Sequence, residues 1–159
     1  MKGKYLILGS NLGDPEGSLQ TAIKKINSEV GKVVRTSSVY VTEPWGIKDQ
    51  PIYYNQVIEV ETELNPYDTL QKLLEIETSM GRIREKKWSA RIIDIDILYF
   101  EDQIINTENL IIPHPGIPDR RFVLVPLCEI IPDKVHPVLK VTNADLLRST
   151  TDTLRVHKI

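Results

Sequence analysis

The sequence has few of the residues that stabilise small secreted domains or anchor a chain in a membrane. It has 159 residues and one cysteine, Cys128, so no internal disulfide can form. Cys128 lies in the apolar run FVLVPLCEII, which favours a buried small hydrophobe over a nucleophile. No apolar run approaches the roughly 18 residues of a membrane-spanning helix. The N-terminal MKGKYLILGS leads into a turn and a helix, not a cleavage site, so we expect a cytoplasmic protein.

An excess of positive charge is also missing. The chain carries 20 Lys and Arg against 22 Asp and Glu, a formal net charge of -2. A general nucleic-acid binder is usually clearly basic, so any anionic ligand must be bound by a local cluster of cations. The sequence contains no internal repeat, low-complexity segment or convincing linker, and 41% of it is hydrophobic. We therefore expect one domain over residues 1–159.

Strand and helix patterns alternate along the first two thirds of the chain. Strand-like runs rich in β-branched and aromatic residues cover 4–10, 33–42, 53–62 and 92–100. Asp14-Pro15 and Asn65-Pro66 pair an N-cap residue with proline, which is typical of helix starts, and Gly31 and Gly81 end the two helices. The order predicts an α+β ferredoxin-like βαββαβ fold, an antiparallel sheet with both helices on one face.

Residues from about 103 onward form an extension of this pattern. A late helix is expected near NADLLRST, at 143–150. The sequence assigns no function to residues 135–159.

The stretch SARIIDIDILYF at 89–100 contains two carboxylates in an otherwise apolar strand. Alternation places Ile93, Ile95, Ile97 and Tyr99 on one face, and Ile92, Asp94, Asp96, Leu98 and Phe100 on the other. The aspartates are then about 6.6 Å apart along the strand, and their repulsion is roughly 2.5 kcal/mol at an effective dielectric of about 20. A solvated outer face would reduce this repulsion. A divalent cation would relieve it too, and Mg²⁺ is commonly held by carboxylates together with substrate phosphates.

A cluster of cations leads into this strand. Residues 82–91 contain five cationic side chains and one glutamate, a formal charge of +4: Arg82, Arg84, Lys86, Lys87, Arg91 and Glu85. The run could be a solvated loop. Arginine is also the natural bidentate ligand of phosphate, so cations beside paired carboxylates are suited to a metal–polyphosphate complex.

Other candidate residues are less specific on their own. Glu77 lies on or beside the apolar stripe of the second helix, where a carboxylate needs solvent, a partner or a ligand. His114, between two prolines, is either a ligand group or a fixed loop residue. Aromatic residues in or beside loops could pack on the surface or form a slot for a planar ring, with Asn55 at its edge. These aromatic residues are Trp45, Tyr53, Tyr54, Trp88 and Phe122.

Five segments in order resemble the 6-hydroxymethyl-7,8-dihydropterin pyrophosphokinases of folate biosynthesis. They are GSNLGD at 9–14, DQPIYYNQV at 49–57, GRIREKKWSARIIDIDILYF at 81–100, IINTENLIIPHP at 104–115 and RRFVLVPLCEI at 120–130. Members of this family have a ferredoxin-like fold and use Mg²⁺ to transfer pyrophosphate from ATP to the pterin hydroxymethyl group, which releases AMP.

The resemblance implies a role for each candidate residue. Asp94 and Asp96 would hold two Mg²⁺ ions, and Arg82 and Arg91 would be catalytic. The residues around ATP would be Glu77, Arg84, Trp88, Ile97, His114 and Arg120. The pterin-binding residues would be Gly9, Thr42, Trp45, Tyr53, Asn55 and Phe122. The chain departs from the familiar pattern at Glu43, Trp45, Leu74, Asn109 and Ile111.

Two other functions share parts of this pattern. A metal-dependent nucleotidyltransferase also pairs a Gly-Ser turn with D-x-D, but here Ser10 and Asp94 are 84 positions apart. A ferredoxin-like RNA-binding module needs an aromatic stacking motif that this sequence lacks. We expect an ATP-dependent pyrophosphokinase that acts as a monomer on ATP and the pterin, without nucleic acid or membrane partners.

Overall fold

The structure, a computed structural model, describes residues 3–42, 52–81 and 92–159. Its elements in chain order are β1 (Lys4–Ser10), α1 (Pro15–Glu29), β2 (Lys32–Thr36), β3 (Tyr40–Thr42), β4 (Tyr53–Glu61), α2 (Pro66–Ser79), β5 (Asp94–Phe100), β6 (Ile105–Asn106), β7 (Ile111–Ile112), the short 3₁₀ helix η1 (Ile117–Asp119), α3 (Arg121–Ile130), α4 (Asn143–Ser149) and β8 (Val156–Lys158). None of the helices in the described ranges is long and apolar enough to span a membrane.

Among the described residues, six strands form one antiparallel sheet. Its order is β5-β1-β4-β3-β8, and β2 pairs with β4 beside β3. β1 lies between β4 and β5. Strands β6 and β7 form a separate hairpin.

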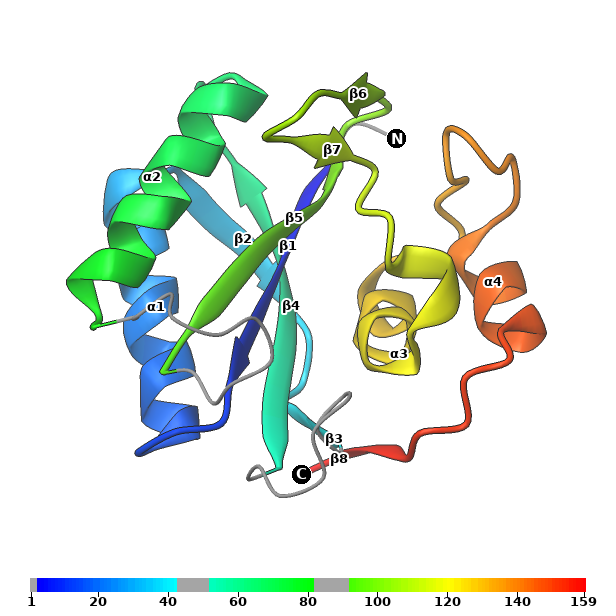
Figure 1. Ribbon diagram of the computed structural model, residues 1–159, viewed down its shortest axis with the longest axis horizontal. Helices are drawn as coiled ribbons and strands as arrows, with labels where there is room; N and C mark the ends of the chain where they lie inside the picture. The colour runs from blue at the N-terminus through cyan, green and yellow to red at the C-terminus, as the bar shows by residue number, and fades with distance from the viewer. Residues whose placement is uncertain (1–2, 43–51, 82–91) are drawn as a thin grey trace.

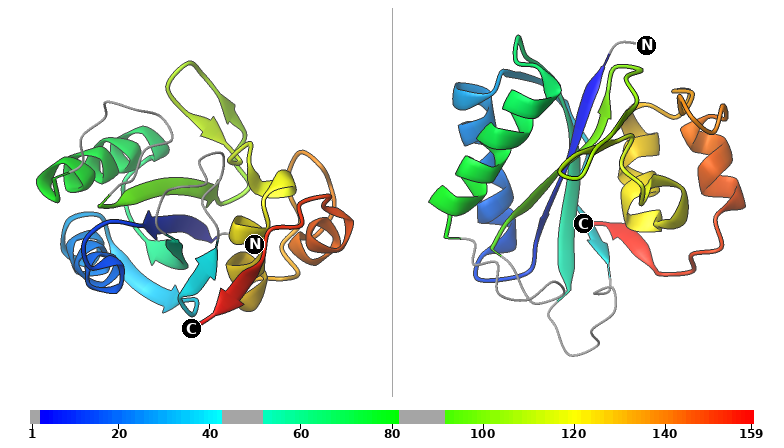
Figure 2. Two further views of the ribbon diagram at one scale, coloured as in Figure 1. Left: turned by 60° about the horizontal axis from the view of Figure 1, so that its bottom comes forward. Right: turned by 45° about the horizontal axis from the view of Figure 1, so that its top comes forward.

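Helices cover the sheet on both faces (Figures 1 and 2). Helices α1 and α2 lie on one face, as predicted, and each begins at the expected cap: Asp14 accepts a hydrogen bond from the Gly17 N–H, and Asn65 from the Asp68 N–H. Helices α3 and α4 of the extension lie on the other face. The α+β fold class is confirmed, and the extension adds the third layer.

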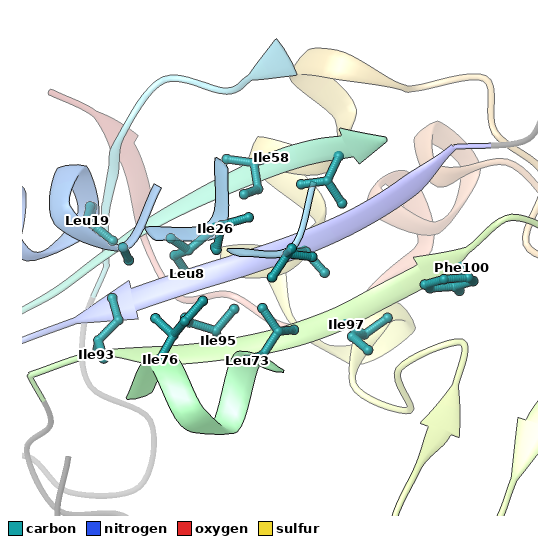
Figure 3. Close-up of a cluster of buried hydrophobic side chains, with 14 of the residues drawn as sticks. Leu8, Leu19, Ile26, Ile58, Leu73, Ile76, Ile93, Ile95, Ile97 and Phe100 are labelled. Carbon is teal, nitrogen blue, oxygen red and sulfur yellow. The ribbon is translucent and has the colours of Figure 1, made fainter. Parts of the chain in front are cut away.

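The larger apolar core lies between the sheet and the first helix pair (Figure 3). Leu8 of β1 and Ile95 of β5 meet Leu19, Ile26 and other residues of α1 and α2 there. We call this the α1/α2 core. The second cluster, the α3/α4 core, joins Ile7, Val57 and Tyr99 of the sheet to residues of α3 and α4.

The predicted alternation in the last strand holds for only part of its length. Ile93, Ile95 and Ile97 point into the α1/α2 core as expected. Leu6 pairs with Ile97, and the preceding residue Tyr5 pairs with Tyr99, so Leu98 is an extra residue in β5. This bulge reverses the alternation beyond it. Tyr99 therefore lies in the α3/α4 core and Phe100 in the α1/α2 core, each opposite to the prediction.

The strand predicted at 33–42 is two strands, β2 and β3, which both pair with β4. Ser37 lies between them. Its N–H donates to the Val57 carbonyl at 2.8 Å, and its hydroxyl accepts the Val57 N–H at 2.9 Å. The side chain replaces a backbone partner at this break in the sheet edge.

The extension contains the late helix that the sequence predicts, α4. Cys128 of α3 is partly exposed, where the sequence predicted a buried residue. Burial nevertheless raises the pKa of its thiol to about 11, so the thiol remains protonated at neutral pH.

The bulge generates a stability prediction. The Tyr99 hydroxyl donates to Asn143 Oδ1 at 2.6 Å in the buried contact between β5 and α4. Tyr99→Phe leaves that amide oxygen without this donor, so we expect the free energy of unfolding to fall by about 1–3 kcal/mol in urea titrations. The exposed Tyr67 provides the control, because Tyr67→Phe should change stability by less than about 0.5 kcal/mol. Equal effects of the two substitutions would contradict the assignment.

Candidate active site

A row of side chains crosses four strands on the sheet face opposite α1 and α2, which we call the aspartate face. Gly9 of β1 pairs with Asp94 on one side and with Asn55 on the other, and Asn55 pairs with Tyr40. Directly paired residues of antiparallel strands point to the same face. Residues distant in the sequence therefore meet in one line across the sheet.

The two carboxylates of β5 lie on this face, as the sequence predicts. Their neighbours Ile93, Ile95 and Ile97 point the other way, into the α1/α2 core. The Asp96 side chain is 46% exposed, so water screens part of the repulsion between the two carboxylates. β5 is thus anchored in the core by its isoleucines, and a ligand can reach the carboxylates of Asp94 and Asp96 on its other face.

Glu77 holds the outer edge of the same strand. Its side chain is only 1% exposed, and Oε2 accepts the Ile95 N–H at 2.7 Å. Ile95 lies between the two aspartates, so this charge-assisted bond fixes the backbone from which both carboxylates project. The expectation that Glu77 needs a partner or ligand is met by a partner, and its predicted contact with ATP stays a prediction.

His114 lies next to the carboxylate pair. The backbone N–H of His114 donates to the Leu98 carbonyl at 2.9 Å and fixes the loop beside β5. In the ring, Nδ1 accepts the backbone N–H of Gly116, so the neutral imidazole carries its proton on Nε2. That nitrogen lies 3.8 Å from Asp96 Oδ2. Burial, and then the positive charge of Arg120, lower the pKa of His114 to about 4, although Asp94 opposes the shift. At neutral pH the ring is a dipole beside Asp96, with no charge to form an ion pair.

The start of α3 brings a cation and an aromatic ring to the same side. The guanidinium of Arg120 lies against Gly116, where a Cβ would be 3.1 Å from Nε. Its Cζ is 5.9 Å from the centre of the Phe122 ring. Gly116 leaves room for the guanidinium, and the Phe122 ring attracts its positive charge.

The far side of the row contains small and polar groups. Thr42 of β3 pairs with Tyr53 of β4, and both point to the aspartate face. Thr42 is 3% exposed, and its Oγ1 has no hydrogen-bond partner within the described chain. Gly9 leaves room for the Asn55 amide, since a Cβ there would lie 2.8 Å from Asn55 Oδ1.

Not all predicted site residues gather here. The side chain of Ile97 lies in the α1/α2 core, and Tyr54 also packs against that core. Five others fall outside the described residues: Trp45, Arg82, Arg84, Trp88 and Arg91.

Comparison with known proteins assigns the family. The sequence profile of the "7,8-dihydro-6-hydroxymethylpterin-pyrophosphokinase (HPPK)" family matches residues 5–132. The chain belongs to the HPPK family. A 2-amino-4-hydroxy-6-hydroxymethyldihydropteridine pyrophosphokinase of Methylorubrum extorquens is 43% identical over 136 residues, which cover 85% of this chain and 86% of the relative. The enzyme of the same name from Haemophilus influenzae is 40% identical over 156 residues, covering 98% and 94%.

A solved HPPK structure has the same fold. The Plasmodium falciparum HPPK-DHPS wild type with SDX-DHP superposes with a TM-score of 0.76 at 22% identity. The match covers 93% of this chain and 43% of that longer chain.

Sequence reasoning missed the residues that hold β3 in this HPPK chain. The carboxylate of Glu129 on α3 accepts the Tyr40 hydroxyl at 2.6 Å and the N–H of Ser38 at 3.0 Å. Burial raises the pKa of Glu129, but the bonds from Tyr40 and Ser38 outweigh it and leave the pKa below its usual value. Burial and Glu129 raise the pKa of Tyr40 to about 12. No local signal links residues 89 positions apart.

The close approach of Gly9 and Asn55 is open to test. Gly9→Ala places a methyl group against the buried Asn55 amide, so we expect a loss of about 1–3 kcal/mol in the free energy of unfolding. The Asn55 side-chain amide resonances should shift in NMR spectra.

Ser10→Ala is the neighbouring control for this substitution. The Ser10 hydroxyl is buried and has no partner among the described residues, so its removal should be nearly neutral. Unchanged Asn55 resonances in Gly9→Ala would show that Gly9 does not set the position of the amide.

Proposed function

We propose that this chain transfers pyrophosphate from Mg-ATP to the hydroxymethyl group of 6-hydroxymethyl-7,8-dihydropterin and releases AMP, a step of folate biosynthesis. Family membership supports the activity. The observation that carries the proposal to this site is the row across the sheet. It aligns the Asp94 carboxylate with the Asn55 amide, on either side of Gly9.

Asp94 and Asp96 are the proposed Mg²⁺ ligands. Their hard oxygen atoms suit Mg²⁺, which in nucleotide sites typically takes one or two carboxylates and completes its shell with phosphates and water. Among residues 3–42, 52–81 and 92–159, no group of three or more His, Cys, Asp or Glu side chains could hold a metal ion. Bound Mg²⁺, two ions by resemblance, would neutralise the phosphate charge and orient the ATP phosphates.

The ATP side of the site combines cations with neutral hydrogen-bonding groups. Arg120, held against Gly116, is suited to a phosphate oxygen. His114 is neutral at physiological pH and offers a hydrogen-bond donor without adding charge. Glu77, through Ile95, keeps the backbone of the aspartates in place. Arg84 and Trp88, outside the described residues, complete the proposed ATP site by resemblance. Ile97 can take part only through its backbone, because its side chain lies in the α1/α2 core.

The pterin side uses the other end of the row. An Asn amide offers both a donor and an acceptor to the edge of a pterin ring. The buried Thr42 hydroxyl has no partner in the described chain, so a ring-edge group would satisfy it. The aromatic rings of Tyr53 and Phe122 are suited to the pterin faces. Trp45, outside the described residues, is assigned here by resemblance alone.

The proposed step is an in-line displacement at the β-phosphorus. The pterin hydroxyl oxygen forms the new bond to the β-phosphorus and loses its proton to solvent. The bond from the β-phosphorus to the α–β bridging oxygen breaks, and AMP leaves with that oxygen. Arg82 and Arg91 are proposed to stabilise the transferring charge. Most of the rate acceleration would come from positioning and electrostatics, so no side chain is assigned as a general base.

The wider setting is part of the same proposal. The substrates are the two small molecules ATP and the pterin. A single pyrophosphokinase domain over 1–159, a monomer in the cytoplasm without nucleic-acid partners, remains the prediction from the sequence.

One assay tests the proposed activity. The purified chain should release AMP from Mg-ATP only when 6-hydroxymethyl-7,8-dihydropterin is added, with one diphosphorylated pterin formed per AMP. Release of pyrophosphate instead would indicate nucleotidyl transfer. RNA binding without turnover would indicate a binding module and contradict the enzyme.

The metal assignment predicts a loss of turnover. Asp94→Asn and Asp96→Asn keep the side-chain shape and remove the charge, so each should lower kcat/KM by about a hundredfold or more at saturating Mg²⁺. Asp68→Asn, in the first turn of α2, is the control and should remain active. Near-normal activity of either site variant would show that its carboxylate is not a metal ligand.

A further inference from the structure

We propose that the C-terminal segment Asp152–Ile159 positions the two walls of the pterin site, the start of α3 and strand β3. This inference rests on the proposed function, because it assigns the substrate whose binding the segment supports. The segment lies beyond residues 5–132, which the family profile matches. Figures 1 and 2 show the chain running from α4 past α3 to pair with β3.

The first anchor is at the start of α3. This helix has no side-chain cap of its own, because its N-cap residue Arg120 makes no capping hydrogen bond. Asp152 supplies the cap from the tail, since its Oδ2 accepts the Arg121 N–H at 2.7 Å. A carboxylate at a helix N-terminus also faces the positive end of the helix dipole. Asp152 therefore holds the turn that presents Arg120 and Phe122.

Two more bonds make this anchor rigid. Arg121 Nη1 donates to the Leu154 carbonyl at 2.7 Å, and the Leu154 N–H donates to Asp152 Oδ1 at 3.0 Å. The carboxylate thus joins the helix to its own tail. Arg121, which donates to both of these tail residues, lies between Arg120 and Phe122, the residues assigned to ATP and to the pterin.

The second anchor is β8, which pairs with β3 along the whole length of that three-residue strand. Val156 lies opposite Thr42, and Lys158 lies opposite Tyr40. The Ile159 N–H donates to the Val39 carbonyl at 3.2 Å. Among the described residues, β3 without β8 would be an edge strand, paired with β4 and bonded to Glu129 of α3.

The two anchors lie only a few residues apart in the tail, so they link the walls directly. Asp152 holds the start of α3, and β8, which begins four residues later at Val156, pairs with β3 as far as Thr42. Helix α3 also contacts both β3 and β8. A displacement of β3 would move the Thr42 hydroxyl, because no hydrogen bond within the described chain holds it in place. The tail therefore sets the distance between a ring-stacking residue and a ring-edge donor.

The backbone offers a selective test of the second anchor. N–H groups two residues apart on a strand point to the same edge, so the His157 N–H faces β3, as that of Ile159 does. His157→Pro removes it from the pairing. Lys158→Pro is the matched control, because the Lys158 N–H faces away from β3 and proline is tolerated on that side of an edge strand.

Binding of each substrate is measured separately in the full-length chain. Fluorescence titration with 6-hydroxymethylpterin reports the pterin side, and calorimetry with Mg²⁺ and α,β-methylene-ATP reports the nucleotide side. We expect His157→Pro to weaken pterin binding about tenfold and to change nucleotide binding less than about twofold. Lys158→Pro should bind both as the unaltered chain does. Circular dichroism melts of each variant test whether it is folded at the assay temperature.

A second pair of substitutions keeps the test decisive if His157→Pro does not fold. Asp152→Ala should weaken the binding of both ligands about fivefold, because the turn that carries Arg120 and Phe122 loses its cap. Asp152→Asn should recover much of the loss. Asp145→Ala is the control: it removes the side-chain half of the capping box of α4, and should lower stability without changing binding.

The outcomes separate this inference from the proposed function. A chain that releases no AMP with the pterin contradicts the function itself. An active chain contradicts the positioning role if His157→Pro or Asp152→Ala binds the pterin normally. It also does so if Lys158→Pro or Asp145→Ala causes the same loss.

Discussion

The antiparallel register of β1 between β5 and β4 is the constraint on which the candidate site depends. It places Gly9 between Asp94 and Asn55, although these residues come from three separate parts of the chain. Because paired residues share a face, the carboxylate and the amide both point away from α1 and α2. A shift of one residue would turn these polar groups into the α1/α2 core, so the same burial that stabilises the sheet sets the site.

The two faces of the sheet have different tasks. The face under α1 and α2 carries the larger apolar core and anchors β5 through its isoleucines. The opposite face is divided: α3 and α4 pack on one part, and the polar row occupies another. The bulge at Leu98 marks this division on β5, because it turns Tyr99 toward the α3/α4 core just beyond the aspartates. On β5, different side chains therefore pack in the cores and face the candidate site.

Much of this could be predicted from the sequence. The two Asx–Pro pairs marked the starts of α1 and α2, and alternation placed both carboxylates on one face, because these patterns follow from local backbone geometry. The same rule gave the wrong face for Tyr99 and Phe100, since a bulge is set by pairing with a distant strand. Glu77 was recognised as a carboxylate in need of a partner, but its contact with the Ile95 N–H depends on how α2 packs beside β5.

The sequence by itself determined the element order, the chemistry of the paired carboxylates and the resemblance to a family that the comparisons then confirmed. Only the tertiary structure decided which residues share a row and how β3 is held. It also decided that the tail, to which the sequence assigned no function, caps α3 and pairs with β3. The reason is physical: caps and alternation depend on neighbours a few residues away, whereas Glu129 with Tyr40 and Asp152 with Arg121 meet only when the packed sheet brings distant segments together.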